Sequence, residues 1–242
     1  LQPSCIAFVR TEIWPVLVRE AERRGVECVL VNAVLADDSS RLKRTARVLL
    51  AEGYGRLNAV GAVSDEDARN LPRLGVATDR IHITGDARFD QVWQRIASID
   101  RERPLLRTLS HGTRLQLVAG STWPRDEEII VDAFAARNLK ARWRLIIAPH
   151  EPTTEHTAGL EARLDRSGLR HRRLPPEGES SPIPDDVDVV VVDRVGVLAD
   201  LYAVADAAYV GGGFGTAGLH SVVEPAALGV PVMYGQNLGN AR

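Results

Sequence analysis

The chain has 242 residues, a net charge of −2, 45% hydrophobic residues and 26% charged residues. This composition is typical of an ordinary globular protein with room for two small domains. The near balance of charge argues against nucleic acid as a partner, because nucleic-acid-binding domains carry a basic excess. No run of about 18 apolar residues is present, so no membrane-spanning helix is predicted. The two cysteines, Cys5 and Cys28, lie in apolar runs and are expected to be buried.

Short apolar runs alternate with helical stretches, which predicts an α/β fold with parallel sheets and helices on both faces. In the first part of the chain the expected strands are 5–9, 28–32, 59–63 and 80–84, and the expected helices are 13–24, 39–52 and one capped by Ser64. In the second part the expected strands are 115–119, 143–148, 187–192, 207–210 and 231–233, and the expected helices are 125–137, 154–167, 195–203 and 220–228.

Periodicity weakens and charge rises between these two parts. We therefore predict a first lobe at 1–97, a linker at 98–114 and a second lobe at 115–242. A Pro-, Ser- and acid-rich surface loop is expected at 175–186. The second lobe is expected to be incomplete at its C-terminus, and the chain to be the interior part of a longer protein.

A glycine-rich segment follows the expected strand 207–210, with five glycines in the eight residues 211–218. Glycines let the backbone approach a ligand closely, and free N–H groups at a helix start attract anions. Residues 211–213 are therefore expected to bind a phosphate, with His220 as a further donor; the alternative is a turn without a ligand. Glu224, one turn into the next helix, is predicted to accept both hydroxyl protons of a ribose. Alternatively, it complements the helix dipole.

Other expected strand ends also carry polar side chains, and ligands bind at the carboxyl ends of parallel strands. Ser121 and Thr122 offer hydroxyls to an anion or sugar, although a plain helix cap is the alternative. His150 ends the next strand and is a candidate ligand. In the first lobe, Glu12 is predicted to face an acceptor hydroxyl, and is equally a first-turn acid that complements a helix dipole. No HxxxH or CxxC spacing occurs, so no metal site is predicted.

Together these segments resemble the 3-deoxy-D-manno-octulosonic acid (Kdo) transferases, which transfer Kdo from CMP-Kdo to a lipid A precursor. The family pattern E-x-E-[IL]-W-P is similar to residues 10–15, and t-G-n-x-K-F-D is similar to residues 84–90. In the second lobe, a-G-S-T-W-x-x-E-E matches residues 119–128, and G-G-S…G-G-H-N-x-x-E-P resembles residues 211–225. The family's P-R-H is shortened to Pro149-His150-Glu151. The similarity runs along almost the whole chain.

The resemblance implies a GT-B glycosyltransferase, with two Rossmann-like lobes facing a ligand cleft and an inverting transfer that needs no metal or other cofactor. The donor CMP-Kdo would be bound by residues of the second lobe, namely Ser121, Thr122, His150, Gly211, Gly212, Gly213, His220, Ser221, Glu224 and Asn240. The family's general base is expected upstream of the chain, so Glu12 is assigned only an assisting role in catalysis.

The resemblance also implies the partners and the place of action. The acceptor would be a lipid A precursor in lipopolysaccharide core biosynthesis, and nucleic acid would not be a partner. The protein would act at the cytoplasmic face of the bacterial inner membrane, either peripherally or through a single anchor outside this chain.

Two alternatives remain open at this point. A UDP-sugar-dependent GT-B enzyme, either a MurG-like transferase or a UDP-GlcNAc 2-epimerase, is compatible with the glycine segment and with residues 224–231. The chain could also be a nucleotide-binding fragment without turnover.

Overall fold

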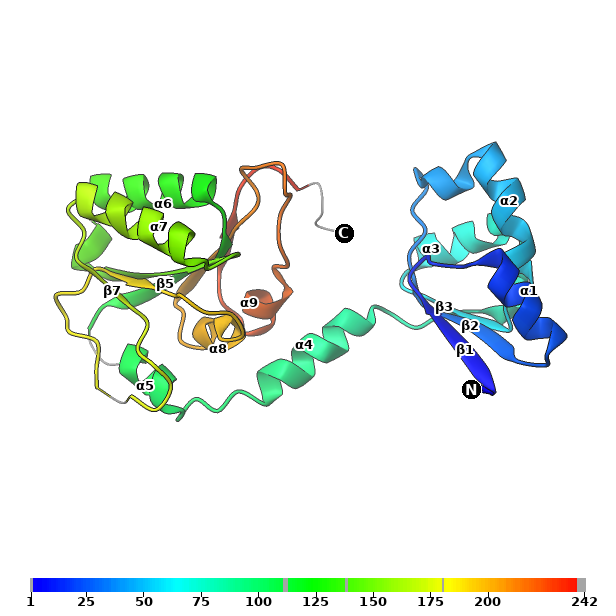
Figure 1. Cartoon of the computed structure of the whole chain (residues 1–242), viewed down its shortest axis with the longest axis horizontal. Helices are drawn as coiled ribbons and strands as arrows, with labels where there is room; N and C mark the ends of the chain where they lie inside the picture. The colour runs from blue at the N-terminus through cyan, green and yellow to red at the C-terminus, as the bar shows by residue number, and fades with distance from the viewer. Residues whose placement is uncertain (1, 111–112, 138, 180, 239–242) are drawn as a thin grey trace. The chain divides into compact units, whose positions relative to one another are not determined.

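The computed structural model describes residues 2–110, 113–137, 139–179 and 181–238 (Figure 1). They form two compact units, Leu1–Asp90 and Gln91–Arg242. The division lies at residues 90 and 91 rather than in the predicted linker 98–114. Helix α4 (Ala87–Ala97), which was not predicted, runs across this division.

The first unit holds a parallel four-stranded sheet in the order β1-β2-β3-β4. Its strands are β1 (Cys5–Val9), β2 (Glu27–Ala33), β3 (Ala59–Ala62) and β4 (Ile81–Ile83). Its helices are α1 (Pro15–Arg23), α2 (Arg44–Gly55) and α3 (Asp65–Asn70), with 3-10 helices at Ser40–Leu42, Leu71–Leu74 and Thr78–Arg80. The predicted cap of α3 is confirmed, because the Ser64 hydroxyl accepts a hydrogen bond from the Asp67 N–H at 3.2 Å.

Helices of the first unit pack against one face of its sheet. Leu30 and Val60 are buried in one core with Val18 of α1 and Tyr54 of α2, whereas the next residue along β2 from Leu30, Val31, is exposed. Strands in sequential order, joined by right-handed crossovers, place every connecting helix on the same side. The expected helices on both faces are therefore not found among the described residues of this unit.

The second unit holds a parallel six-stranded sheet in the order β10-β9-β5-β6-β8-β7. Its strands are β5 (Leu115–Thr122), β6 (Trp143–Pro149), β7 (His171–Arg173), β8 (Val189–Val191), β9 (Ala207–Val210) and β10 (Val232–Tyr234). Its helices are α5 (Pro104–Ser110), α6 (Pro124–Ala136), α7 (Thr154–Arg166), α8 (Leu198–Tyr202) and α9 (Val223–Ala227), with a 3-10 helix at Leu139–Ala141.

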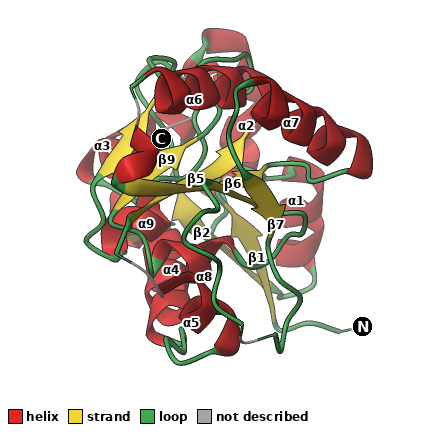
Figure 2. Cartoon of the chain, turned by 90° about the vertical axis from the view of Figure 1, so that its left-hand side faces the viewer, coloured by secondary structure: helices red, strands yellow, loops and turns green. Residues whose placement is uncertain are grey.

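This second sheet is covered on both faces, as predicted (Figures 1 and 2). Phe134 of α6 and Leu160 of α7 pack with Ile147 on one face. Leu109 of α5 and Leu201 of α8 belong to a separate core on the other face. Adjacent residues of a strand point to opposite faces, so each buried strand supplies side chains to both cores. The predicted parallel α/β fold is confirmed.

Several expectations about the elements were wrong. The segment predicted as a linker contains α5, whose buried leucines form part of the second unit's core. β7 was not predicted, because its sequence His-Arg-Arg lacks an apolar run. α9 begins at Val223 rather than near His220. Cys5 is exposed and only Cys28 is buried, because residues of β1 face alternately toward the core and away from it.

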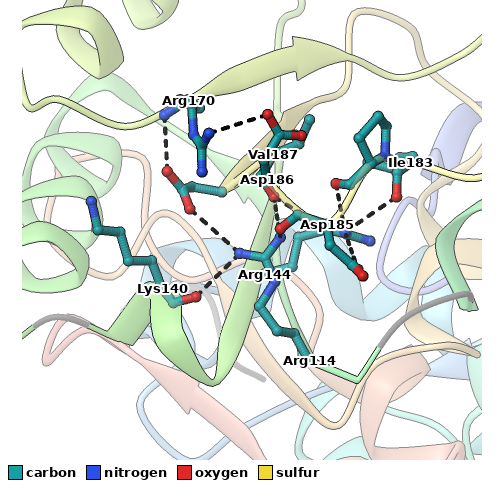
Figure 3. Close-up of polar contacts among 10 residues, drawn as sticks. Arg114, Lys140, Arg144, Arg170, Ile183, Asp185, Asp186 and Val187 are labelled. Carbon is teal, nitrogen blue, oxygen red and sulfur yellow. Dashed lines mark hydrogen bonds and ion pairs between the residues drawn. The ribbon is translucent and has the colours of Figure 1, made fainter.

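Two arginines hold the predicted surface loop at the amino ends of the strands (Figure 3). Arg144, which is 1% exposed, donates to the carbonyls of Val187 at 3.3 Å and Pro184 at 3.0 Å. Arg114 donates to the carbonyl of Val187 at 2.5 Å. Burial, and then the charge of Arg114, lowers the pKa of Arg144. This polar cluster is therefore a structural brace at the end of the sheet opposite the carboxyl ends of the strands.

Among the described residues, no helix combines the length and the apolar character that a membrane crossing requires.

Candidate functional site

The carboxyl ends of β5 and β9 meet at the place where strand order reverses. β5 is followed in sequence by β6 on one side, and its other neighbour is β9. Ligands of open parallel sheets bind in the crevice at such a switch point. The Gly211 N–H donates to the Gly120 carbonyl at 2.9 Å, which joins the two loops that leave these strands. The predicted segments 120–123 and 211–213 are therefore brought together.

The glycines of the β9 loop are required by packing within the chain. A Cβ on Gly211 would lie 2.2 Å from the Ser121 carbonyl oxygen, and one on Gly213 would lie 2.6 Å from the Gly235 nitrogen. Gly212 has a φ of +93°, which favours glycine, and its Cβ would lie 2.1 Å from a backbone oxygen. Close approach between loops therefore explains the glycines without a bound phosphate.

A buried carboxylate that was not predicted as a site residue holds these loops together. Asp126 of α6 is 1% exposed and accepts hydrogen bonds from the Trp123 N–H at 2.9 Å, the Gly212 N–H at 2.9 Å and the Tyr209 hydroxyl at 2.6 Å. Burial, and then the bond to Asp126, raises the pKa of Tyr209. The Gly212 N–H is therefore bonded to Asp126 rather than free for an anion. In the sequence, the acidic run Asp126-Glu127-Glu128 at the start of the expected helix 125–137 was the signal that could have identified this carboxylate.

Three aromatic rings, from the loops that follow β5, β6 and β9, form a cluster at this place. The centroids of His150 and His220 are 4.3 Å apart, and those of Trp123 and His150 are 5.0 Å apart. The indole Nε1–H of Trp123 donates to Nε2 of His220 at 3.0 Å. Because Nε2 accepts this bond, Nδ1 carries the proton of a neutral His220 and can donate to a ligand.

The ring environment favours the neutral form of His220. Burial lowers its pKa, the neighbouring His150 lowers it further, and Asp126 opposes both effects. A neutral imidazole that donates from Nδ1 can bind a phosphate or carboxylate oxygen. The two predicted histidines are thus adjacent, and Trp123 is an additional member that the sequence placed in a motif but not in the site.

Ser121 and Thr122 differ in their surroundings although they are consecutive. Ser121 is half-buried and has a φ of +51°, a left-handed conformation that is strained for a residue with a Cβ. Such conformations cluster at functional sites. Thr122 is fully buried, and its hydroxyl donates to Oε1 of Glu127 at 2.9 Å. The Thr122 side chain therefore serves an internal hydrogen bond, and Ser121 is the one nearer to solvent.

Glu224 lines a separate cavity in the second unit. It is the second residue of α9, so it lies in the first turn rather than one turn into the helix. The cavity has a volume of about 590 Å³, and its lining includes Arg95 of α4 and Leu198 of α8. Burial raises the pKa of Glu224, and the charge of Arg95 opposes this. Among the described residues, no side chain forms a hydrogen bond with this carboxylate.

Arg95 is a second charged group of this cavity that sequence reasoning missed. Its Nη2 donates to Oδ1 of Asp200 at 2.9 Å, and Arg103 donates to Oδ2 of the same carboxylate at 2.6 Å. Asp200 is buried, so two guanidinium groups share one buried negative charge. The other N–H groups of the Arg95 guanidinium do not donate to Asp200. The cavity therefore combines an acceptor for hydroxyl groups with a donor for anions.

Three other predicted site residues do not join these groups. Glu12 belongs to the first unit, has a side chain that is 73% exposed, and pairs with Arg41 at 3.3 Å. Ser221 lies before α9, and its hydroxyl accepts from the Val223 N–H at 3.4 Å. Asn240 lies outside the described residues. No cluster of three potential metal ligands occurs in the part of the chain that the structure describes.

Sequence comparisons point to one family. Residues 1–91 match the family model of 3-deoxy-D-manno-octulosonic-acid transferase (Kdo transferase). The Kdo transferase of Bordetella pertussis is 29% identical over 98% of this chain and 54% of its own length. The chain is similar to Kdo transferases along nearly its whole length. The resemblance inferred from the motifs is confirmed.

The comparisons also show how much of each similar protein the chain covers. A bifunctional glycosyltransferase/methyltransferase of Fusobacterium nucleatum is 26% identical over 97% of this chain and 36% of its own length. The chain thus spans about half, or less, of these relatives. The solved UDP-GlcNAc 2-epimerase of Methanocaldococcus jannaschii covers 96% of this chain with a TM-score of 0.59 and 14% identity, and this chain covers 61% of it. That likeness shows a shared fold with Rossmann-like units.

Proposed function

We propose that this chain is part of a glycosyltransferase that moves Kdo from CMP-Kdo to a lipid A precursor in lipopolysaccharide core biosynthesis. The observation that carries this proposal is the match to Kdo transferases along nearly the entire chain. The predicted donor-site motifs also fall at the carboxyl ends of β5, β6 and β9, where a parallel sheet binds ligands.

The second unit offers suitable groups for such a donor both in the ring cluster and in the cavity of Glu224, and His220 and Glu224 are only four positions apart in the chain. CMP-Kdo carries a phosphodiester and a carboxylate, and Nδ1–H of His220 and the guanidinium of Arg95 are donors for anions. The Glu224 carboxylate is an acceptor for the ribose hydroxyls. In an inverting transfer, the acceptor hydroxyl gives its proton to a general base, expected upstream of this chain, and attacks the anomeric carbon of Kdo. The bond from that carbon to the phosphate oxygen breaks, and CMP leaves. Positive or hydrogen-bonding side chains near the phosphate would stabilise the charge that develops there, so no metal is required.

Calorimetry with CMP and UDP tests the donor class. We expect the chain to bind CMP more tightly than UDP, and EDTA to leave the CMP affinity unchanged. The Glu224→Ala variant should weaken CMP binding by about 1–3 kcal/mol, because a charged hydrogen bond is lost. Markedly tighter UDP binding would contradict the proposal and favour a UDP-sugar enzyme. An unchanged CMP affinity in Glu224→Ala would remove Glu224 from the site.

The acceptor and the place of action belong to the same proposal. A lipid A precursor lies in a membrane, so we propose that the protein works at the cytoplasmic face of the bacterial inner membrane, with Glu12 assisting at the acceptor. Transfer of labelled Kdo from CMP-Kdo to the lipid A precursor in vesicles is the direct assay. Transfer to a soluble sugar alone would contradict the lipid acceptor.

A further inference from the structure

A buried carboxylate and a histidine lie next to the aromatic cluster. Glu127 is in the first turn of α6 and is 3% exposed. His156 is in the first turn of α7, and its Nε2 is 3.0 Å from both carboxylate oxygens of Glu127. The Thr122 hydroxyl donates to the same carboxylate at 2.9 Å, and Nδ1 of His156 is 3.1 Å from the Glu151 carbonyl oxygen. The pair therefore joins residues 122–127 to residues 151–156.

The partners determine where the proton of this pair lies. A carbonyl oxygen only accepts hydrogen bonds, so Nδ1 of His156 carries a hydrogen and donates it to Glu151. One further proton must lie between Nε2 and the Glu127 carboxylate, because two bare acceptors at this distance would repel. The pair is then either an imidazolium with a carboxylate or an imidazole with a carboxylic acid. Both forms have no net charge, which makes burial of the pair tolerable.

The two residues that bond to this pair, Thr122 and Glu151, are sequence neighbours of the rings of the candidate donor site. Trp123 directly follows Thr122, and His150 directly precedes Glu151. The His150 N–H also donates to the Thr122 carbonyl at 2.9 Å. The two backbone segments from which Trp123 and His150 extend are therefore connected both directly and through the buried pair. His220 stacks on His150 and accepts from Trp123, so its place depends on both rings.

We propose that Glu127 and His156 are positioning residues for the donor site. By joining the ends of β5 and β6, they set the arrangement of Trp123, His150 and His220 that receives the donor. This inference rests on the proposed function. The pair also lines a cavity of about 460 Å³ between α6 and α7, so a simple brace between those helices is the competing explanation.

Two measurements distinguish a role in positioning the three rings from a role in holding α6 and α7 together. The first is the dissociation constant for CMP, and the second is the NMR signal of the Trp123 indole N–H, assigned with the Trp123→Phe variant. We expect Glu127→Ala and His156→Ala to shift the indole signal and to weaken CMP binding by about tenfold. Glu127→Gln should restore both, because its amide can accept from Thr122 and donate to Nε2 of a neutral His156.

The matched control is Glu161→Ala on the same helix as His156. Glu161 pairs with Arg173 at 2.7 and 2.9 Å, and its partner lies on β7 rather than at the ends of β5 and β6. Its removal should change neither readout. If Glu127→Ala and His156→Ala behave like this control, the pair only braces the helices and the inference is wrong. A failure of Glu127→Gln to restore the indole signal would also contradict it.

The indole signal also separates this inference from the proposed function. It is measured without nucleotide, so it reports the ring arrangement even if the wild-type chain does not bind CMP. Absent CMP binding with a shifted indole signal in the alanine variants would refute the proposed donor while leaving the ring-positioning role intact. Should one alanine variant fail to fold, the other still tests the role of the pair against the Glu161→Ala control.

Discussion

Each unit of the molecule places a Trp-Pro pair at the start of the helix that follows its first strand. In the first unit, Trp14-Pro15 opens α1 after β1, and in the second unit Trp123-Pro124 opens α6 after β5. Both strand ends contain a non-glycine residue with a left-handed φ, Arg10 at +63° and Ser121 at +51°. Pro suits the first helical position because its missing N–H would be unsatisfied there anyway. The local turns are therefore alike.

The surroundings of the two tryptophans differ sharply. Trp14 is 64% exposed. Trp123 is half-buried, its N–H donates to Asp126, and its indole donates to His220, which is 97 positions away in the sequence. The same local motif thus produces an exposed ring in one unit and part of a candidate site in the other. Distant residues, rather than the motif, make the difference.

Removing Asp126 should have the largest effect, because this carboxylate creates the surroundings of Trp123. In Asp126→Ala, three donors lose their acceptor, two of them in buried hydrogen bonds, and we expect the free energy of unfolding of the second unit to fall by about 3 kcal/mol or more. Urea-induced unfolding followed by circular dichroism measures it. The control is Asp132→Ala on the same helix, an exposed residue that pairs with Arg163 at 3.3 Å. Equal losses in the two variants would disprove the role of Asp126.

A methyl group at Gly211 tests the close approach between the loop after β9 and the end of β5. Gly211→Ala places a Cβ against the Ser121 carbonyl oxygen, and we expect a loss of about 2–3 kcal/mol, as for overpacked sites. Gly215→Ala is the matched control in the same loop, since the nearest heavy atom to its Cβ would be 4.0 Å away. Thermal unfolding of both variants decides the matter, and a Gly211→Ala variant as stable as Gly215→Ala would refute the predicted clash.

Exchanging the rings themselves tests the comparison directly. Trp123→Phe loses the hydrogen bond to His220, so the unfolding free energy should fall by about 1 kcal/mol. Trp14→Phe should change it by less than about 0.5 kcal/mol, because the ring is exposed. Both values come from urea titrations under identical conditions. If the two substitutions change the free energy of unfolding equally, the contacts of Trp123 do not stabilise the protein more than those of Trp14.

The smallest expected effect concerns pH. Burial and His150 lower the pKa of His220 below the ordinary histidine value of 6.5, so the unfolded chain binds a proton at this histidine more readily than the folded chain does. The contribution of neutral His220 to stability is therefore complete above pH 6.5 and is lost as the pH falls through the lower folded pKa. His220→Gln should lose less stability than wild type between about pH 7 and pH 5. The control His82→Gln, at an exposed position in the first unit, should keep the wild-type dependence.

Local patterns in the sequence were sufficient for most elements of the fold. Each strand predicted from an apolar run is present, with ends within a few residues of those expected. The failures share a cause. β7 is short and polar, and α4 and α5 lie where charge obscures helical periodicity. α5 is stabilised by its leucines, which are buried in the core of the second unit.

For the site, the sequence by itself placed Ser121, His150 and the glycines 211–213 at strand ends, and it singled out His220 as a further ligand donor. Only the tertiary structure decided which of them meet, because strand order and loop packing, not local periodicity, bring residues about 90 positions apart into contact. In the tertiary structure the Gly212 N–H donates to Asp126 and the Thr122 hydroxyl donates to Glu127, so neither is free for a ligand. Glu224 lies in a separate cavity with Arg95. Hydrogen bonds between distant loops depend on geometry that no single segment encodes.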